Sequence, residues 1–279
     1  MYLDLGRAEP ATRATGETPG PVTPLALSRV VDTTSEPFRY ICRIHVRTTK
    51  DGNSFGTGVL ISRHHVLTCS HVLFPRDNPN PREVTVLPGQ KGPDDKRPRI
   101  RADGWVVSPG WSPYDCQTDT EDLAIIRLAR PVDGYWPLAP FEPSIFSFSV
   151  AAHLAGYPAL REDPKAQWMH ESRGRVIARI QVNCCCDPTP HKKGMLNRTL
   201  FKDISDSTRL IAHDLDTRPS MSGGPMWLFW EGKRVLFALH AGDIDGGARK
   251  KGILLNATVR KRIAEWMERG LPPLHTGSR

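Results

Sequence analysis

Along most of this chain, short apolar runs alternate with turn-forming residues. From Tyr40 onward, β-branched and aromatic residues gather in groups that Gly, Pro, Asn and Asp interrupt. Runs of this kind predict strands joined by turns. The eight clearest are YICRIHV (40–46), GVLIS (58–62), EVTVLP (83–88), GWVVS (104–108), LAIIRL (123–128), RVIARI (175–180), RVLFALH (234–240) and GILLNAT (252–258). With hardly any helical period between them, they predict an all-β fold, as an antiparallel sandwich or barrel.

One segment near the end, residues 258–270, follows a helical period instead. Val259, Ile263, Trp266 and Met267 recur at the spacing of one helix face, and charged residues lie between them. A glycine at position 270 is a typical helix stop. The pattern predicts a terminal amphipathic helix that packs on the rest of the fold.

The first 28 residues show neither period. They are rich in Pro, Thr, Gly and Ala, which predicts a flexible leader or pro-segment over residues 1–28. No basic start followed by an apolar core is visible, so we expect a cytoplasmic protein in preference to a secreted one. A secreted protein already trimmed of its signal is the alternative. No apolar run approaches the roughly 18 residues of a membrane span, so we expect no membrane partner.

The charge balance is basic. Lysine and arginine number 38 and aspartate and glutamate 30, which gives a formal net charge of +8. Such a charge attracts acidic partners, including nucleic acids. The basic residues are scattered, however, and no nucleic-acid-binding motif accompanies them. We therefore expect a basic, solvated surface and no nucleic-acid partner.

Six cysteines are present, three of them in the run Cys184-Cys185-Cys186. Three adjacent cysteines cannot all pair with one another, and their spacing matches no common zinc pattern. We expect reduced thiols, no metal and no other cofactor. A metal site that also uses His191 is the less favoured alternative.

The sequence DTRPSMSGGPMW, residues 216–227, places Ser222 directly before two glycines and a proline. This serine either belongs to an ordinary polar turn or is a nucleophile that faces a substrate carbonyl. Gly223 and Gly224 allow a close backbone approach, and the N–H groups of Ser220 and Ser222 are candidate donors to an oxyanion. A serine hydroxyl needs a base to remove its proton, so the second hypothesis requires partners elsewhere.

Two candidate partners precede apolar strands. His71 follows the predicted strand 58–62, and a histidine is the usual general base for a hydroxyl nucleophile. Asp122 directly precedes the predicted strand 123–128, where a buried carboxylate needs a partner. Each alone also fits a structural role: a core or turn histidine, and an aspartate that caps backbone N–H groups. The order His71, Asp122, Ser222 is the triad order of chymotrypsin.

These residues carry a resemblance to a known family. The chain resembles the chymotrypsin-like serine proteases through Thr68-Cys69-Ser70-His71, Asp122-Leu123-Ala124 and Ser222-Gly223-Gly224-Pro225. The closer likeness is to the bacterial glutamyl endopeptidases, through Ala155-Gly156-Tyr157-Pro158 and Ala238-Leu239-His240-Ala241-Gly242.

The resemblance implies two six-stranded antiparallel β-barrels with the site between them, followed by the C-terminal helix. Residues 29–145 would form the N-terminal barrel with His71 and Asp122. Residues 146–279 would form the C-terminal barrel, with Ser222, and the terminal helix. By the same likeness, His71 takes the proton of Ser222, Asp122 holds the imidazole tautomer, and water resolves an acyl-enzyme. The implied activity is that of a monomeric serine endopeptidase acting on proteins or peptides.

The sequence is compatible with two specificities. The resemblance assigns the pocket for the residue before the scissile bond to Asp216, Thr217 and His240. Asp216 at the pocket base would suit Lys or Arg, whereas His240 with the Thr217 hydroxyl would hold a carboxylate through charge-assisted hydrogen bonds. We favour cleavage after Glu or Asp.

Ser220 departs from the family, which nearly always has glycine two residues before the nucleophile. If its Cβ prevents the backbone turn, one oxyanion donor is misdirected, at a cost of about 10²–10³ in rate. The rival hypothesis is therefore a catalytically weak protease fold used as a binding module. An esterase is disfavoured, because that fold orders its triad serine, acid, histidine.

Overall fold

The computed structural model describes residues 25–49, 52–75, 81–141, 150–180, 209–244 and 249–269. Most of the predicted leader, the cysteine run 184–186 and His191 lie outside this part of the chain. Cys42 and Cys69 are buried free thiols, as expected for reduced cysteines.

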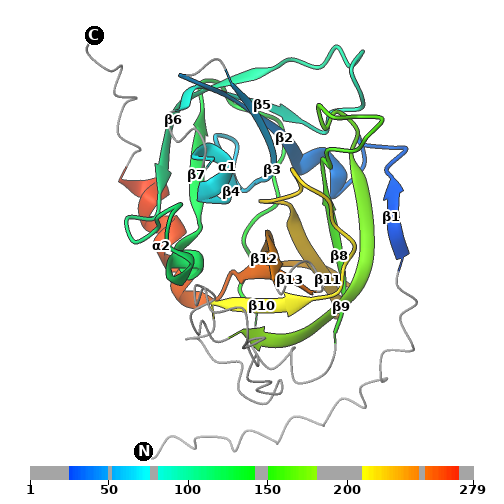
Figure 1. The fold of residues 1–279 in the computed structure, drawn as a ribbon, viewed down its shortest axis with the longest axis vertical. Helices are drawn as coiled ribbons and strands as arrows, with labels where there is room; N and C mark the ends of the chain where they lie inside the picture. The colour runs from blue at the N-terminus through cyan, green and yellow to red at the C-terminus, as the bar shows by residue number, and fades with distance from the viewer. Residues whose placement is uncertain are drawn as a thin grey trace, which may run out of the picture.

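Six strands of the N-terminal half close into an antiparallel barrel, which lies in the upper part of Figure 1. Neighbouring strands follow the order β2-β3-β4-β7-β6-β5 around the ring. The strands are β2 (Ile41–Thr48), β3 (Asn53–Leu60), β4 (His65–Thr68), β5 (Pro81–Pro88), β6 (Ile100–Val107) and β7 (Ala124–Leu128). Short helical turns accompany them: η1 (Phe38–Tyr40), α1 (Ser70–Leu73) and η2 (Cys116–Glu121).

The C-terminal half forms a second barrel. Its strands run in the order β9-β10-β13-β12-β11-β8, and a pairing of β8 with β9 closes the ring. They are β8 (Val150–Gly156), β9 (His170–Ile180), β10 (Leu210–His213), β11 (Pro225–Trp230), β12 (Lys233–Ile244) and β13 (Arg249–Leu254). Two six-stranded antiparallel barrels were predicted, and the structure confirms them.

Each of the eight apolar runs overlaps a strand. The sequence pattern missed four further barrel strands, each for a physical reason. β4 and β10 span only four residues each, and the apolar positions of β8 are mostly alanine. β11 starts at Pro225, directly after the candidate serine turn, so its beginning looked like the end of a loop. The last predicted run was too long, because Asn256 already begins the terminal helix.

One correction concerns the predicted leader. Residues 25–28 are not a flexible segment but belong to β1 (Leu25–Arg29), which pairs antiparallel with β9 at the edge of the second barrel. The Val30 N–H continues this contact by donating to the Met169 carbonyl at 2.9 Å. The run LALSR is too short and mixed to be recognised as a strand, and its pairing with β9 depends on the tertiary structure.

The terminal helix α2 (Ala257–Glu268) agrees with its prediction. The Asn256 side chain accepts a hydrogen bond from the Val259 N–H at 2.9 Å, which caps the first turn. Val259 and Ile263 are buried in the main core, and Trp266 and Met267 pack partly against it. Although α2 follows the second barrel in sequence, it lies beside β6 of the first one (Figure 1).

Apolar residues fill the barrels and the junction between them. Trp227 is 2 % exposed and its ring lies 5.7 Å from the ring of Trp136 in an edge-to-face contact.

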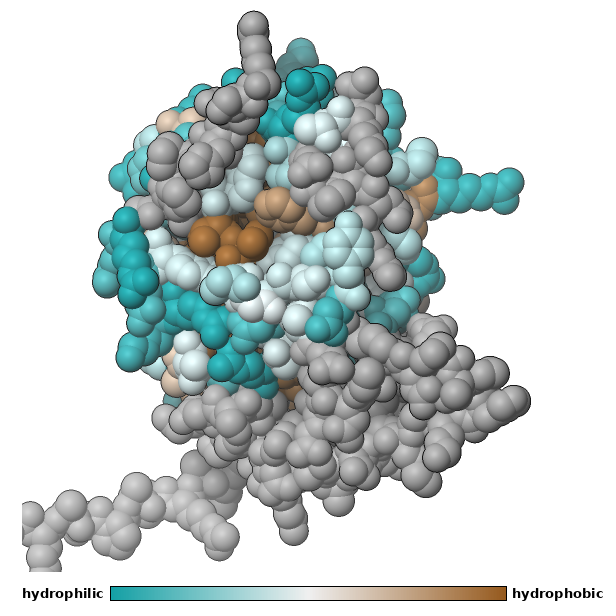
Figure 2. All heavy atoms as spheres, turned by 60° about the vertical axis from the view of Figure 1, so that its left-hand side comes forward, coloured by the Kyte–Doolittle hydropathy of each residue, from teal (hydrophilic) through white to brown (hydrophobic). Residues whose placement is uncertain are grey.

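On the face presented in Figure 2, the described surface is mostly hydrophilic or of intermediate hydropathy, with one hydrophobic group near its centre. Among the described helices, none is long and apolar enough to cross a membrane.

Candidate active site

His71 lies on α1, immediately after β4. The Ser70 hydroxyl donates to the Leu123 carbonyl at 2.8 Å, which ties α1 to the segment entering β7. The buried Cys69 thiol donates to the His240 carbonyl at 3.4 Å, across the boundary between the barrels. These two bonds position His71 against both its own barrel and its neighbour.

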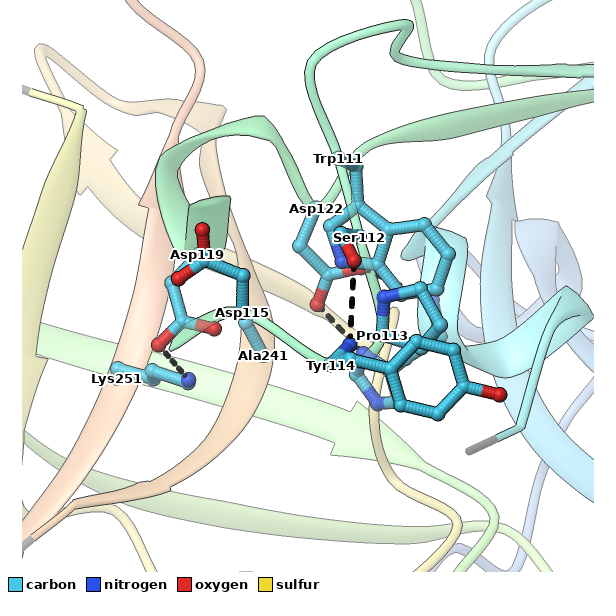
Figure 3. A pocket seen from close by; sticks show the side chains of 10 residues that line it. Trp111, Ser112, Pro113, Tyr114, Asp115, Asp119, Asp122, Ala241 and Lys251 are labelled. Carbon is cyan, nitrogen blue, oxygen red and sulfur yellow. Dashed lines mark hydrogen bonds and ion pairs between the residues drawn. The ribbon is translucent and has the colours of Figure 1, made fainter. Parts of the chain in front are cut away.

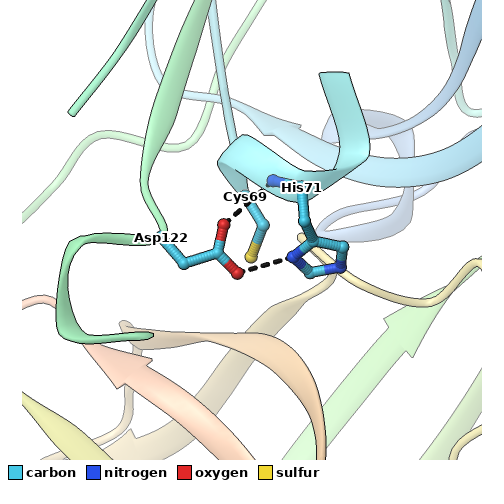
Figure 4. A group of neighbouring side chains, drawn as sticks. All are labelled: Cys69, His71 and Asp122. Carbon is cyan, nitrogen blue, oxygen red and sulfur yellow. Dashed lines mark hydrogen bonds and ion pairs between the residues drawn. The ribbon is translucent and has the colours of Figure 1, made fainter. Parts of the chain in front are cut away.

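Asp122 binds His71 with both carboxylate oxygens (Figure 4). Oδ1 accepts the backbone N–H of His71 at 2.9 Å, and Oδ2 contacts the imidazole Nδ1 at 2.5 Å. The Asp122 side chain is 4 % exposed, whereas that of His71 is 34 % exposed. A buried carboxylate thus fixes the ring through Nδ1, and the other ring nitrogen, Nε2, is left for a substrate or a nucleophile.

The electrostatic surroundings favour the charged form of His71. Burial lowers the pKa of the imidazole, but the charge of Asp122 and its hydrogen bond outweigh that effect and raise the pKa above its ordinary value. The Lys251 charge lowers this pKa and the Asp119 charge raises it. His71 is therefore a base whose protonated form has a stabilising partner.

Thr57 on β3 holds the loop that contains Ser222. Its N–H donates to the Ser222 carbonyl at 2.9 Å, and its hydroxyl donates to the Ser220 carbonyl at 3.0 Å. The same hydroxyl accepts the Tyr157 N–H at 2.9 Å. One threonine of the first barrel therefore binds two segments of the second. It holds the Ser222 loop against β3, which is the neighbour of β4.

Glycine is the residue type that fits position 223. Its φ is +81°, and a Cβ there would lie 2.1 Å from the Thr57 carbonyl oxygen and 2.3 Å from the Thr68 hydroxyl. Its N–H donates to the His240 carbonyl at 2.8 Å, and the His240 N–H donates to the Gly224 carbonyl at 2.9 Å. The close approach of three strands forces the turn that follows Ser222.

Ser220 adopts the turn conformation despite its Cβ. Its φ is +72°, in the left-handed region that glycine prefers. The preceding Pro219 carbonyl accepts the Ala159 N–H at 2.8 Å. Because a planar trans peptide directs its C=O and N–H to opposite sides, the Ser220 N–H points away from Ala159. Within the described chain, neither this N–H nor that of Ser222 has an acceptor.

The model of the trypsin-like peptidase domain matches residues 56–235, which span β3 to β12 and include His71, Asp122 and Ser222. The chain belongs to the trypsin-like peptidase family. The resemblance to chymotrypsin-like serine proteases is thereby confirmed. A search of curated protein sequences finds no significant match.

Solved structures share the fold of this peptidase at low sequence identity. A Glu endopeptidase structure superposes with a TM-score of 0.63 at 17% identity, covering 86% of this chain and 95% of that one. The thermostable serine protease AL20 from an extremophilic microorganism gives a TM-score of 0.57 at 15% identity, covering 80% and 94%. The protease Anisep from Arthrobacter nicotinovorans gives 0.55 at 12% identity, covering 80% and 93%.

His240, which was predicted to line the specificity pocket, lies next to the Ser222 loop in the peptidase. It is 2 % exposed, and burial lowers its pKa to about 3. Its Nδ1 lies 3.2 Å from Nε2 of His213 on β10. His213 is fully buried, and burial, followed by the charge of His240, holds its pKa well below the usual range. Two neutral imidazoles therefore form a buried hydrogen-bonded pair.

The other two predicted pocket residues differ in environment. Thr217 is 5 % exposed. Asp216 accepts the Leu27 N–H of β1 at 3.2 Å and forms an ion pair with Arg218. The Asp216 carboxylate is thus compensated by groups of the protein itself.

Cys69, His71 and Asp122 offer ligand atoms within 4.8 Å of one another, which raises the question of a metal. A thiol binds metals as its thiolate. Burial, followed by the charge of Asp122, raises the pKa of Cys69 well above its ordinary value, and the thiol proton is donated to the His240 carbonyl. The cluster therefore suits a hydrogen-bonded histidine and carboxylate better than a metal.

Sequence reasoning missed three kinds of residue in the site. Thr57 lies in an apolar strand where a hydroxyl was the only indication of a role. His213 was one of ten histidines, and nothing in the sequence connects it with His240. Asp119 and Lys251 lie in a short turn and on a strand, and they are charged residues of the kind that usually stay in water.

Proposed function

We propose that this peptidase is a serine endopeptidase that cleaves after Glu or Asp through His71, Asp122 and Ser222. The observation that carries the proposal is the double hydrogen bond of Asp122 to His71. In the neutral imidazole, it favours the tautomer with the proton on Nδ1 and an unprotonated Nε2. That tautomer is the one a general base for a serine hydroxyl requires.

In the proposed mechanism, the Ser222 hydroxyl attacks the scissile carbonyl as His71 Nε2 takes its proton. The imidazolium that forms is stabilised by the Asp122 carboxylate. His71 then gives the proton to the leaving amine, and an acyl group remains on Ser222. Water enters, loses a proton to His71 and releases the acid product.

The N–H groups of Ser220 and Ser222 are the proposed oxyanion donors. Support comes from the absence of an acceptor for either group in the described chain and from the bond between the Pro219 carbonyl and Ala159. Preorganised donors of this kind stabilise charge that develops during the reaction. The left-handed conformation of Ser220 argues against the hypothesis that its Cβ misdirects a donor.

A glycine at position 220 tests this conclusion. We expect Ser220→Gly to keep kcat/KM within about threefold of the wild type, because the donor already points away from Ala159. Relief of the left-handed strain, roughly 1–2 kcal/mol for a residue with a Cβ, should offset the added freedom of the unfolded chain. Steady-state kinetics on one peptide, with urea unfolding alongside, measure both. A rise in kcat/KM of about 10² or more would mean that the serine had misdirected the donor.

The preference for an acidic residue rests on the His213–His240 pair. One proton lies between Nε2 of His213 and Nδ1 of His240. Nδ1 of His213 is buried without a hydrogen-bond partner among the described residues, and an orphaned acceptor there is less costly than an orphaned N–H donor. The favoured arrangement has His213 donating to His240, with the remaining proton on Nε2 of His240. That N–H is suited to a substrate carboxylate.

The compensated charge of Asp216 weakens the alternative of cleavage after Lys or Arg. A pocket for a cationic side chain needs a carboxylate that lacks a partner until the substrate arrives. Asp216 already pairs with Arg218 and with the Leu27 N–H. A substrate cation would have to displace the arginine.

A fluorophosphonate probe and a defined peptide mixture test the proposal together. The probe should add to Ser222, as read by mass spectrometry of tryptic fragments, and not to Ser222→Ala. Cleavage positions in the mixture should follow Glu and Asp. Cuts after Lys or Arg would transfer the specificity to Asp216, while neither labelling nor cleavage would leave the binding module as the better hypothesis.

His240 variants test the pocket in the same assay. His240→Leu should lower kcat/KM for a Glu peptide by about 10–150-fold, the effect of one hydrogen bond to a charged group. A matched Gln peptide should lose less. His240→Gln keeps an N–H donor and should retain more activity, and His64→Gln, on an exposed turn, is the control. Equal losses for both peptides would exclude His240 from carboxylate recognition.

A further inference from the structure

An ion pair outside the three proposed catalytic residues lies in the same pocket as His71 and Asp122. Lys251 on β13 donates to the Asp119 carboxylate in η2 (Figure 3). The side chains are 14% and 24% exposed. Both line a pocket of about 290 Å³ together with His71, Asp122 and Ala241. The pair joins the second barrel to the segment of the first that carries Asp122.

The backbone beside Lys251 leaves room for its side chain to reach Asp119. Lys251 pairs with Gly242 of β12, whose φ is +124°. A Cβ on Gly242 would lie 3.8 Å from Cε of Lys251, and no other atom of the described residues is recorded within 4 Å of it. The lysine stem therefore passes over a residue without a side chain.

The segment around Asp119 is fixed at a second point. Glu121 forms ion pairs with Arg209, at 3.1 Å, and with Arg262 of α2. Asp119 and Glu121 precede Asp122 by three residues and one, and the Asp122 N–H donates to the Asp119 carbonyl at 3.3 Å. Ion pairs to β13, to the start of β10 and to α2 thus hold the turn from which the carboxylate reaches His71.

The two charges of the pair act on His71 with opposite signs, because Lys251 disfavours the imidazolium and Asp119 favours it. Among the described residues, the other ionisable groups around His71 are Asp122, the neutral His240, the buried thiol of Cys69, and Tyr114 and Asp115 of the loop that lines the pocket. Of these groups and the pair, Lys251 is the one that carries a positive charge.

We propose that Asp119 and Lys251 are positioning residues for the His71–Asp122 pair. The ion pair holds the Asp122 turn against the second barrel. Because the charges of Lys251 and Asp119 act on His71 with opposite signs, their effects on its proton affinity cancel. Asp122 then determines that affinity. The role in catalysis rests on the proposed function, whereas the effect on His71 itself does not.

The test uses Lys251→Met, Asp119→Asn and the double variant, all in the full chain. Losing the lysine leaves the Asp119 charge alone, so the pKa of His71 should rise. Losing the carboxylate leaves the ammonium alone, so the pKa should fall. Each change in the pKa of His71 should be on the order of half a unit or more, because both charges line the same pocket as the imidazole. The double variant should titrate within about 0.3 unit of the wild type, because both charges are gone.

Two readouts follow the same proton. NMR titration of the His71 imidazole, assigned by comparison with His71→Gln, needs no turnover. The pH profile of kcat/KM should rise with the neutral base, so its acidic limb should move to higher pH in Lys251→Met and to lower pH in Asp119→Asn. Arg47→Met, which breaks an exposed ion pair with Glu83, is the matched control and should move neither readout.

The outcomes separate the two proposals. Opposite shifts in the single variants, cancelled in the double variant, support the positioning role even if no peptide is cleaved, in which case only the proposed function fails. Shifts of the same sign, or no shift while the single variants lose activity, would reduce the ion pair to a structural contact and overturn the inference. The double variant guards against a fold defect, since it should recover the pKa that each single variant loses.

Discussion

Replacing Ser222 with alanine is expected to lower kcat by about 10⁶-fold, to a residual rate that binding and the oxyanion donors alone sustain. The hydroxyl is the proposed site of covalent attachment, so no other described group can replace it at the same point of the turn. KM for a Glu peptide should change little, because the substrate contacts that do not involve Oγ remain.

Single-turnover hydrolysis of a chromogenic peptide, followed over several hours, covers this range. Ser35→Ala, at an exposed position between β1 and η1, is the matched control and should retain the wild-type rate. A Ser222→Ala enzyme with more than about one hundredth of the wild-type kcat would contradict the proposed nucleophile, since a triad serine contributes far more than that.

Asp122→Asn is expected to lower kcat by about 10⁴-fold while the fold remains intact. Asparagine offers one acceptor oxygen where Asp122 offers two, and the His71 N–H and Nδ1–H both require one. If the amide oxygen keeps the backbone bond, its NH₂ group faces Nδ1 and forces the imidazole proton onto Nε2. That tautomer cannot accept the Ser222 proton.

The measurement is kcat together with ¹⁵N chemical shifts of the His71 ring, which distinguish the two tautomers. Asp103→Asn serves as the control, because Asp103 is a half-exposed residue whose one ion pair within the described part of the chain is with Arg127, at 2.7 Å. A loss below about tenfold, or an unchanged tautomer, would remove the orienting role from Asp122.

Local sequence patterns were sufficient for much of the architecture. An apolar run between turn formers has few ways to bury itself other than as a strand, and eight such runs became strands of the two barrels. The helical period of residues 258–270 likewise needed one face of a helix to pack against the core. The short, alanine-rich or proline-initiated strands were missed because their stability comes from neighbouring strands.

For the candidate site, the sequence likewise predicted the residues, whereas their geometry came from the structure. His71, Asp122 and Ser222 were predicted from the sequence because their order and flanking residues match a family. Their order did not predict that both oxygens of Asp122 bind His71, nor that Ser220 tolerates a φ of +72°. Such geometry depends on the backbone on both sides of the site.

By itself, the sequence determined where apolar faces recur and which residue types follow them, and these gave the all-β class, the terminal helix and the candidate triad. Only the tertiary structure decided that Thr57 contacts Ser220, 163 residues away, and that Lys251 reaches Asp119 over 132 residues. A polar contact of this kind leaves no period in either segment, because one hydroxyl or one charge suffices. Its partner is chosen by the closure of two barrels, which depends on every strand at once.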